Sequence, residues 1–66
     1  MMDDAKKAKW ENMCWAIAET YVYVVIRGRR VTPSQVVALA ERDMGRALKP
    51  HTRAKIAECV NLINDR

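Results

Sequence analysis

The stretch that decides the fold is TPSQVVALAERDMG, residues 32–45. It opens with a capping hydroxyl on Thr32, a proline at the first helical position and a glutamine three residues after the cap. Apolar residues then recur at helical spacing, and Gly45 suits the left-handed conformation in which many helices end. The stretch therefore predicts a helix over residues 33–44. The side expected to face inward comprises Val36, Val37, Leu39, Ala40 and Met44.

A longer helical pattern precedes this stretch, over residues 4–27. The run from Tyr21 to Ile26 is rich in β-branched and aromatic residues and would also suit a strand. Because the helical period continues into this run without a break, we expect one long helix that ends at Gly28. The face expected to point into the core comprises Trp10, Met13, Cys14, Ile17, Tyr21, Val24 and Val25.

A third helix is predicted over residues 51–64. Two signals mark its start: Pro50 suits the first turn of a helix, and the hydroxyl of Thr52 could cap it, which is the role we expect for Thr52. The pattern of three helices predicts a single all-α domain, residues 1–66. The inward stripe expected on the third helix comprises Ile56, Cys59, Val60 and Ile63.

Size and composition restrict the function. A 66-residue chain has a small core with only a few kcal/mol of net stability, which self-association often supplements. Cys14 and Cys59 lie far apart and the chain has one histidine, so cysteine and histidine cannot form a four-ligand zinc site. We expect no cofactor or metal, and two buried thiols in a reducing compartment. The acidic start does not fit a secretion signal, so we expect a cytoplasmic protein.

Positive charge is concentrated in the middle of the chain. Residues 27–55 contain eight basic and two acidic residues, a net charge of +6, whereas residues 1–26 and 56–66 each sum to −1. An accumulation of one sign of charge attracts polyanions, of which nucleic acid is the commonest in a cell. The same residues could instead form an ordinary solvated surface in which acidic neighbours pair with them. The distribution favours nucleic-acid binding.

Residues 31–64 resemble a helix-turn-helix DNA-binding module, with a short capped helix, a glycine-containing turn and a helix opened by polar residues. The connection from Gly45 to Pro50 is longer than the turn usual in that family, so the angle between the helices is left open. The resemblance implies that the start of the third helix enters the major groove. Arg53 and Lys55 are then expected nearest the base edges, with other cations on phosphates.

This interpretation requires one cationic footprint, formed by the bend after the first helix and the start of the third. The N-termini of the second and third helices would both favour phosphate there. The residues predicted to bind DNA are Arg29, Arg30, Arg46, Lys49, His51, Thr52, Arg53 and Lys55.

The first helix carries a second apolar face, opposite its core stripe. Two short helices of so small a protein cannot cover both faces, and an exposed apolar patch with aromatic residues is typical of a contact site. We expect a homodimer through this face, because symmetric pairs are the commonest oligomers. The alternative is a small adaptor or inhibitor, of the size that phages and plasmids carry, that docks on another protein. The residues of this face are Trp15, Val22, Tyr23 and Ile26.

The sequence therefore predicts a dimeric protein that binds double-stranded DNA, a small transcriptional regulator. Catalysis is not expected, because the only serine, Ser34, and the only histidine, His51, belong to different helices. Single-stranded RNA is disfavoured, because residues 27–66 contain no aromatic side chain except His51. Membrane contact is not expected, because the apolar part of the first helix has no lysines on its polar face.

Overall fold

The computed structural model describes residues 3–27 and 30–66, which form three helical regions. α1 comprises Asp4–Thr20 and continues directly into the π-helix η1, Tyr21–Ile26. α2 comprises Pro33–Met44, and α3 comprises Pro50–Asn64. No strand occurs in these described ranges, which confirms the predicted all-helical fold and the helical prediction for residues 21–26.

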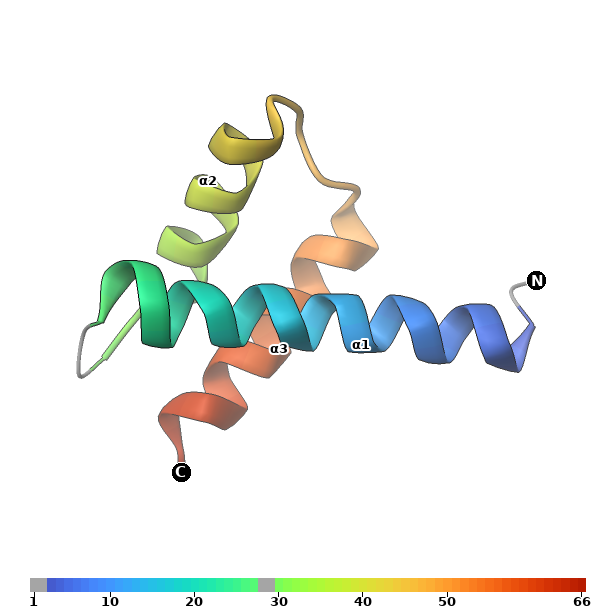
Figure 1. Ribbon diagram of the computed structural model, residues 1–66, viewed down its shortest axis with the longest axis horizontal. Helices are drawn as coiled ribbons and strands as arrows, with labels where there is room; N and C mark the ends of the chain where they lie inside the picture. The colour runs from blue at the N-terminus through green and yellow to red at the C-terminus, as the bar shows by residue number, and fades with distance from the viewer. Residues whose placement is uncertain (1–2, 28–29) are drawn as a thin grey trace.

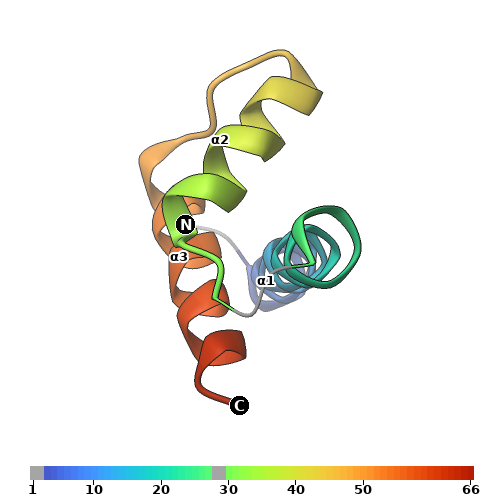
Figure 2. The same cartoon turned by 90° about the vertical axis from the view of Figure 1, so that its left-hand side faces the viewer.

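The helices form two layers, with α1 lying across the pair α2 and α3 (Figures 1 and 2). The extents of 36 × 29 × 17 Å agree with this arrangement, because the shortest of them is close to the thickness of two packed helices. α2 and α3 are splayed apart and joined by the connection 45–49, which lies at the top of Figure 1. α3 packs against both other helices and so joins the two layers.

The ends of α2 are those predicted from its sequence. The Thr32 hydroxyl accepts the backbone N–H of Gln35 at 3.2 Å, while the Gln35 side-chain oxygen accepts the backbone N–H of Thr32 at 2.9 Å. This reciprocal pair satisfies two N–H groups that a helix start leaves without partners. At the other end Gly45 has φ +71° and donates its N–H to the carbonyl of Glu41 at 2.9 Å, which ends the helix.

Of the two predicted start signals of α3, the structure confirms Pro50 and contradicts Thr52. Lys49 occupies the cap position and Pro50 the first helical position, so the proline decides where the helix begins. The expected capping role of Thr52 is wrong, because this residue already lies within the first turn and its side chain faces α1. Its hydroxyl accepts a hydrogen bond from Nε1 of Trp10 at 3.1 Å. Trp10 is half-buried against the core, as expected.

The core lies between the two layers. α3 contributes the largest share, and its predicted inward stripe is confirmed, since all four of its residues are buried. α2 contributes Val36 and Ala40, while Val31 and Leu48 come from the segments that flank α2. The buried apolar residues are Cys14, Ala18, Val22, Val31, Val36, Ala40, Leu48, Ile56, Cys59, Val60 and Ile63.

Along α1 and η1 the core-facing residues recur every four positions: Cys14, Ala18 and Val22 are buried and Ile26 is half-buried. In an α-helix, with about 3.6 residues per turn, each four-residue step overshoots a full turn, so this series would rotate away from the core. The i→i+5 bonds of a π-helix place more residues in each turn. The step from Val22 to Ile26 therefore falls short of a full turn and reverses this rotation, so that Ile26 stays on the same side of the helix as Cys14.

This winding contradicts part of the predicted orientation of the first helix. Val22 and Ile26 were expected on the outer face, yet they face the core. Met13, Val24 and Val25 were expected in the core, yet they are 45%, 59% and 50% exposed. The prediction assumed a constant rotation of about 100° per residue, which η1 does not keep.

η1 ends at Arg27, which adopts the left-handed conformation with φ 55° and ψ 31°. Its backbone N–H donates to the carbonyl of Val22 at 3.1 Å, and its Nε donates to the carbonyl of Val24 at 3.1 Å. Arg27 thus has the left-handed helix-ending conformation that the sequence predicted for Gly28. Gly28 itself lies outside the described residues. The side-chain bond helps an L-residue to hold a conformation that favours glycine.

Candidate nucleic-acid interface

The cations predicted to bind DNA lie at opposite ends of α3. Arg30 lines a hollow with the last turn of that helix, and the side-chain amide of Asn64 donates to the carbonyl of Val31 at 2.7 Å. Lys49 lies at the other end of this 15-residue helix, about 22 Å away by helical rise. The expectation of a single footprint is therefore wrong for Arg30, because Asn64 ties the bend to the end of α3. Arg29 lies outside the described residues.

Lys55 is engaged within the fold. Its Nζ lies 3.4 Å from Oε2 of Glu11 on α1 and 3.6 Å from Oε2 of Glu58, and only 19% of its side chain is exposed. Desolvation lowers the pKa of Lys55, but its hydrogen bond to Glu11 and the two carboxylate charges outweigh that effect, so its pKa is raised. The expected position of Lys55 nearest the base edges does not fit this geometry, because the ammonium faces α1.

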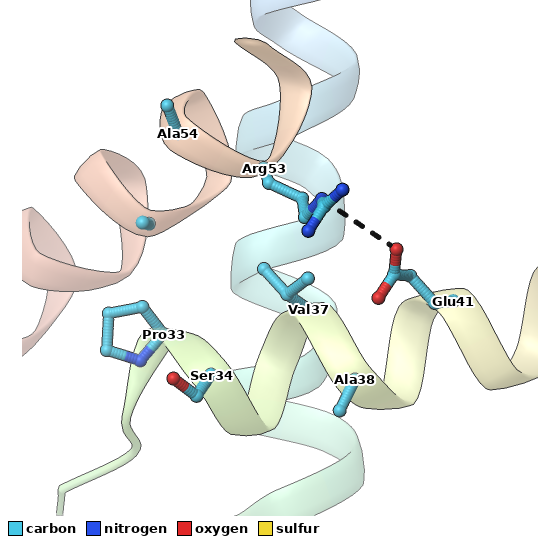
Figure 3. A pocket seen from close by; sticks show the side chains of 8 residues that line it. Pro33, Ser34, Val37, Ala38, Glu41, Arg53 and Ala54 are labelled. Atoms are coloured by element: carbon cyan, nitrogen blue, oxygen red, sulfur yellow. Dashed lines mark ion pairs between the residues drawn. The ribbon is translucent and has the colours of Figure 1, made fainter. Parts of the chain in front are cut away.

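Arg53 is held at the end of the α2–α3 connection. Its Nε donates to the carbonyl of Leu48 at 3.0 Å and lies 3.9 Å from Oε2 of Glu41 (Figure 3). The same carboxylate oxygen accepts the backbone N–H of Leu48 at 2.7 Å. Glu41 and Arg53 thus fix the connection from both sides, and about half of the Arg53 side chain, 48%, remains exposed.

The first turn of α3 meets α1 through Trp10. Besides its hydrogen bond to Thr52, the Trp10 ring lies 5.4 Å from the His51 ring, centroid to centroid, at an angle of 36°. Thr52 is buried, so the geometry places this predicted DNA contact inside the fold, whereas His51 is exposed. The pairing of Trp10 with this turn sets how the start of α3 sits against α1.

The acidic side chains near the end of α2 also have partners. Asp43 accepts a hydrogen bond from the Tyr21 hydroxyl at 2.6 Å and lies 3.6 Å from Nε of Arg42. The hydrogen bond to this carboxylate, together with lesser desolvation, raises the pKa of Tyr21, because ionisation would place two negative charges together. Since Asp43 balances Arg42 and Glu41 balances Arg53, the positive charge left at this end comes from the connection itself.

Two exposed cations lie where that connection meets α1, and two more continue along the same face of α1. Arg46 and Lys49 line a hollow of about 270 Å³ together with Met13 of α1. Lys9 and Lys6 precede Met13 by one and two turns on the same face of α1. Within residues 3–27 and 30–66 none of the four takes part in an ion pair. We call Lys6, Lys9, Arg46 and Lys49 the cationic surface.

The α1 part of this surface, Lys6 and Lys9, was not among the residues predicted to bind DNA. The lysines of α1 lie in a segment whose net charge is −1, because acidic residues such as Asp3 and Glu11 cancel them in a count. In the fold, Glu11 pairs with Lys55 and Asp3 caps α1 by accepting the backbone N–H of Lys6 at 2.8 Å. The spacing of Lys6 and Lys9 on one helical face was the available signal.

The predicted contact face of the first helix is only partly exposed. Val22 is buried, and Trp15 and Ile26 are half-buried against the core. The guanidinium of Arg66 lies over the Trp15 ring, 5.6 Å from its centroid. Of the four residues expected there, Tyr23 alone is exposed.

Tyr23 instead belongs to a different apolar patch. It is 53% exposed, and its neighbours Val24 and Val25 are exposed to a similar extent. We call these three residues the apolar tip. They lie on η1, at the end of the long helix beside the bend, at the left of Figure 1.

A groove of about 430 Å³ lies between α2 and α3, with α1 passing behind it (Figure 3). Short side chains line it, and the pair Glu41 and Arg53 closes one end. Ser34 provides a hydroxyl, and the carboxylate in the groove, Glu41, accepts the backbone N–H of Leu48 and pairs with Arg53. The groove therefore offers a packing surface and one ion pair. Its other lining residues are Pro33, Val37, Ala38, Ala54 and Ala57.

Both cysteines are free thiols buried in the core. Burial is the main cause that raises the pKa of Cys14 and of Cys59, so both remain protonated and unreactive near neutral pH. In the part of the chain that the structure describes, no cluster of histidine, cysteine and acidic residues could hold a metal ion. None of the helices described is both long and apolar enough to span a bilayer.

Compared with known protein families, curated proteins and solved structures, the chain matches none of them.

Proposed function

We propose that the protein binds double-stranded DNA through the cationic surface. The observation that carries this proposal is that Arg46 and Lys49 are exposed on the α2–α3 connection and line one hollow, which Met13 of α1 also lines, one turn from Lys9. Such an accumulation attracts phosphates and increases the rate of encounter with a polyanion. The acidic side chains at the end of α2 pair with other arginines, Glu41 with Arg53 and Asp43 with Arg42, and in the described chain neither Arg46 nor Lys49 has an ion-pair partner.

A duplex is the ligand that this surface fits best. Proteins that hold single strands stack bases on exposed aromatic side chains. Trp10, which follows Lys9 in α1, is half-buried and bonded to Thr52, and its ring lies 5.4 Å from that of His51, so neither ring stands alone as a stacking platform. The splayed helices α2 and α3 support a helix-turn-helix-like second half, with the five-residue connection in place of a tight turn (Figure 1).

Fluorescence anisotropy of a short labelled duplex tests the proposal. Binding at low salt should weaken steeply as salt increases, with a log–log slope of about −2 to −4, because each neutralised phosphate contributes about −0.9. Arg46→Ala should weaken binding and reduce the size of the slope by about 1. Arg30→Ala is the matched control, because it removes the same charge from an exposed arginine at the other end of α3.

Two results would contradict the proposal. One is an unchanged anisotropy at low salt up to high protein concentration. The other is an equal loss of affinity in Arg46→Ala and Arg30→Ala, which would mean that net charge decides binding and the cationic surface does not.

A protein contact through the apolar tip is the second candidate. Its three residues are each at least half exposed, and exposed apolar side chains that lie together are typical of interaction sites. The tip supports the predicted homodimer, with Tyr23 and its valine neighbours in place of the residues that the core covers. It equally supports an adaptor that binds another protein.

Sedimentation velocity at micromolar concentration separates these uses. A species of twice the chain mass that Val24→Asp converts to a monomer would establish the dimer. Leu62→Asp is the control, because it places the same charge on an apolar side chain of similar exposure, 47%, that belongs to α3 and is not one of the three residues of the tip. A monomer in the wild type would refute self-association and leave the tip for another partner.

A further inference from the structure

We propose that the protein binds the phosphate backbone of duplex DNA without sequence-specific base contacts, and that α3 does not enter the major groove as a recognition helix. This inference rests on the proposed function and concerns the same cationic surface. It follows from which side chains of α3 are free and which are engaged.

Reading bases requires donors and acceptors that extend from a helix into the groove. Of the four polar side chains in the first turns of α3, three are engaged within the fold, and the fourth, His51, is exposed with its ring 5.4 Å from that of Trp10. Thr52 is buried against Trp10, and the ammonium of Lys55 lies between two carboxylates. Arg53 bonds to the carbonyl of Leu48 and pairs with Glu41, so turning it toward a base would break both interactions.

The other exposed side chains of α3 are poorly suited to a groove. Ala54 and Ala57 are too short to reach a base edge, and both line the groove between α2 and α3. Glu58 follows, with 60% of its side chain exposed, and its charge would repel the phosphates on either side of a major groove. Asn61 is the next polar residue on this face, but insertion that brought it to a base would bring Glu58 as well.

The free cations lie outside α3. Arg46 and Lys49 are on the connection, and Lys6 and Lys9 are on α1. Three of the four are lysines, which act as point charges on phosphates and lack the planar fork with which arginine recognises guanine. Contacts of this kind position a protein on DNA but carry no sequence information.

Competition between duplexes tests the inference. A labelled duplex bound to the full chain is displaced by unlabelled duplexes of equal length, one of alternating A·T and one of alternating G·C, and by a pool of random sequence. We expect affinities within about threefold of one another, against the roughly 10³-fold or greater preference of sequence-specific proteins. Selection from the random pool should enrich no motif.

An α3 variant adds a second readout. Asn61→Ala should change affinity less than twofold, and Lys49→Ala should weaken binding to all duplexes by the same factor. A motif enriched by selection, or a preference lost in Asn61→Ala, would refute sequence-independent binding while leaving the proposed function intact. Failure to bind any duplex would refute the proposed function, and this inference with it.

Discussion

The hydrogen bond between Trp10 and Thr52 joins α1 to the start of α3, and Thr52→Val removes it with little change of shape. The indole Nε1 lies 3.1 Å from the Thr52 hydroxyl, and Thr52 is only 7% exposed. A hydrogen bond of this kind contributes about 1 kcal/mol net, and an indole N–H left without a partner costs about 1–3 kcal/mol. Because Trp10 is half-buried and water can reach part of it, we expect a loss of about 1–2 kcal/mol.

Urea unfolding followed by circular dichroism measures this loss. Thermal unfolding should show the same loss as a lower Tm, by about 4–8 °C for each 1 kcal/mol in a domain of this size. Thr20→Val is the matched control, because Thr20 is exposed on α1 and its hydroxyl makes no hydrogen bond among the residues with described positions. A double-mutant cycle with Trp10→Phe should give a coupling energy of about 1 kcal/mol.

Equal stability of Thr52→Val and Thr20→Val, with no coupling to Trp10→Phe, would refute the reasoning. The same variant separates the structural role of Thr52 from its predicted DNA contact. We expect the affinity for duplex DNA to be unchanged, because the hydroxyl faces Trp10 inside the fold.

Three further predictions concern other contacts of the fold. Tyr21 should ionise above the ordinary tyrosine pKa of about 10, and Tyr21→Phe should remove that late step from the ultraviolet titration; a variant that keeps the step would contradict the assignment. The stability from the Tyr21 hydrogen bond is complete below pH 10 and is lost as the pH rises through the raised pKa. Glu41→Ala should lower the free energy of unfolding by about 1–3 kcal/mol, because the backbone N–H that it binds at 2.7 Å loses its acceptor; Glu19→Ala, at an exposed position of α1, should not. Cys14 and Cys59 should react with a thiol reagent only after unfolding, and rapid labelling of the native protein would contradict their burial.

The parts of the fold that the sequence predicted correctly depend on residues close together in the chain. The start of α2 needs only Thr32 and Gln35, three positions apart, and its end needs only the freedom of Gly45 to adopt positive φ. The buried stripe of α3 follows from the spacing of its apolar residues. Each of these signals acts within about one helical turn, so a short stretch of sequence contains all of it.

The tertiary structure decided which cations remain free. Lys55 pairs with Glu11, 44 positions earlier, and the bend near Arg30 is tied to the end of α3 by Asn64, 33 positions beyond Val31. A charge count along the chain treats all basic residues alike. It gave the segment with Lys6 and Lys9 a net charge of −1 and so did not indicate that these lysines belong to the cationic surface. By itself the sequence determined three helices and an excess of positive charge. Only packing decided where that charge faces solvent, because each partner comes from a distant segment.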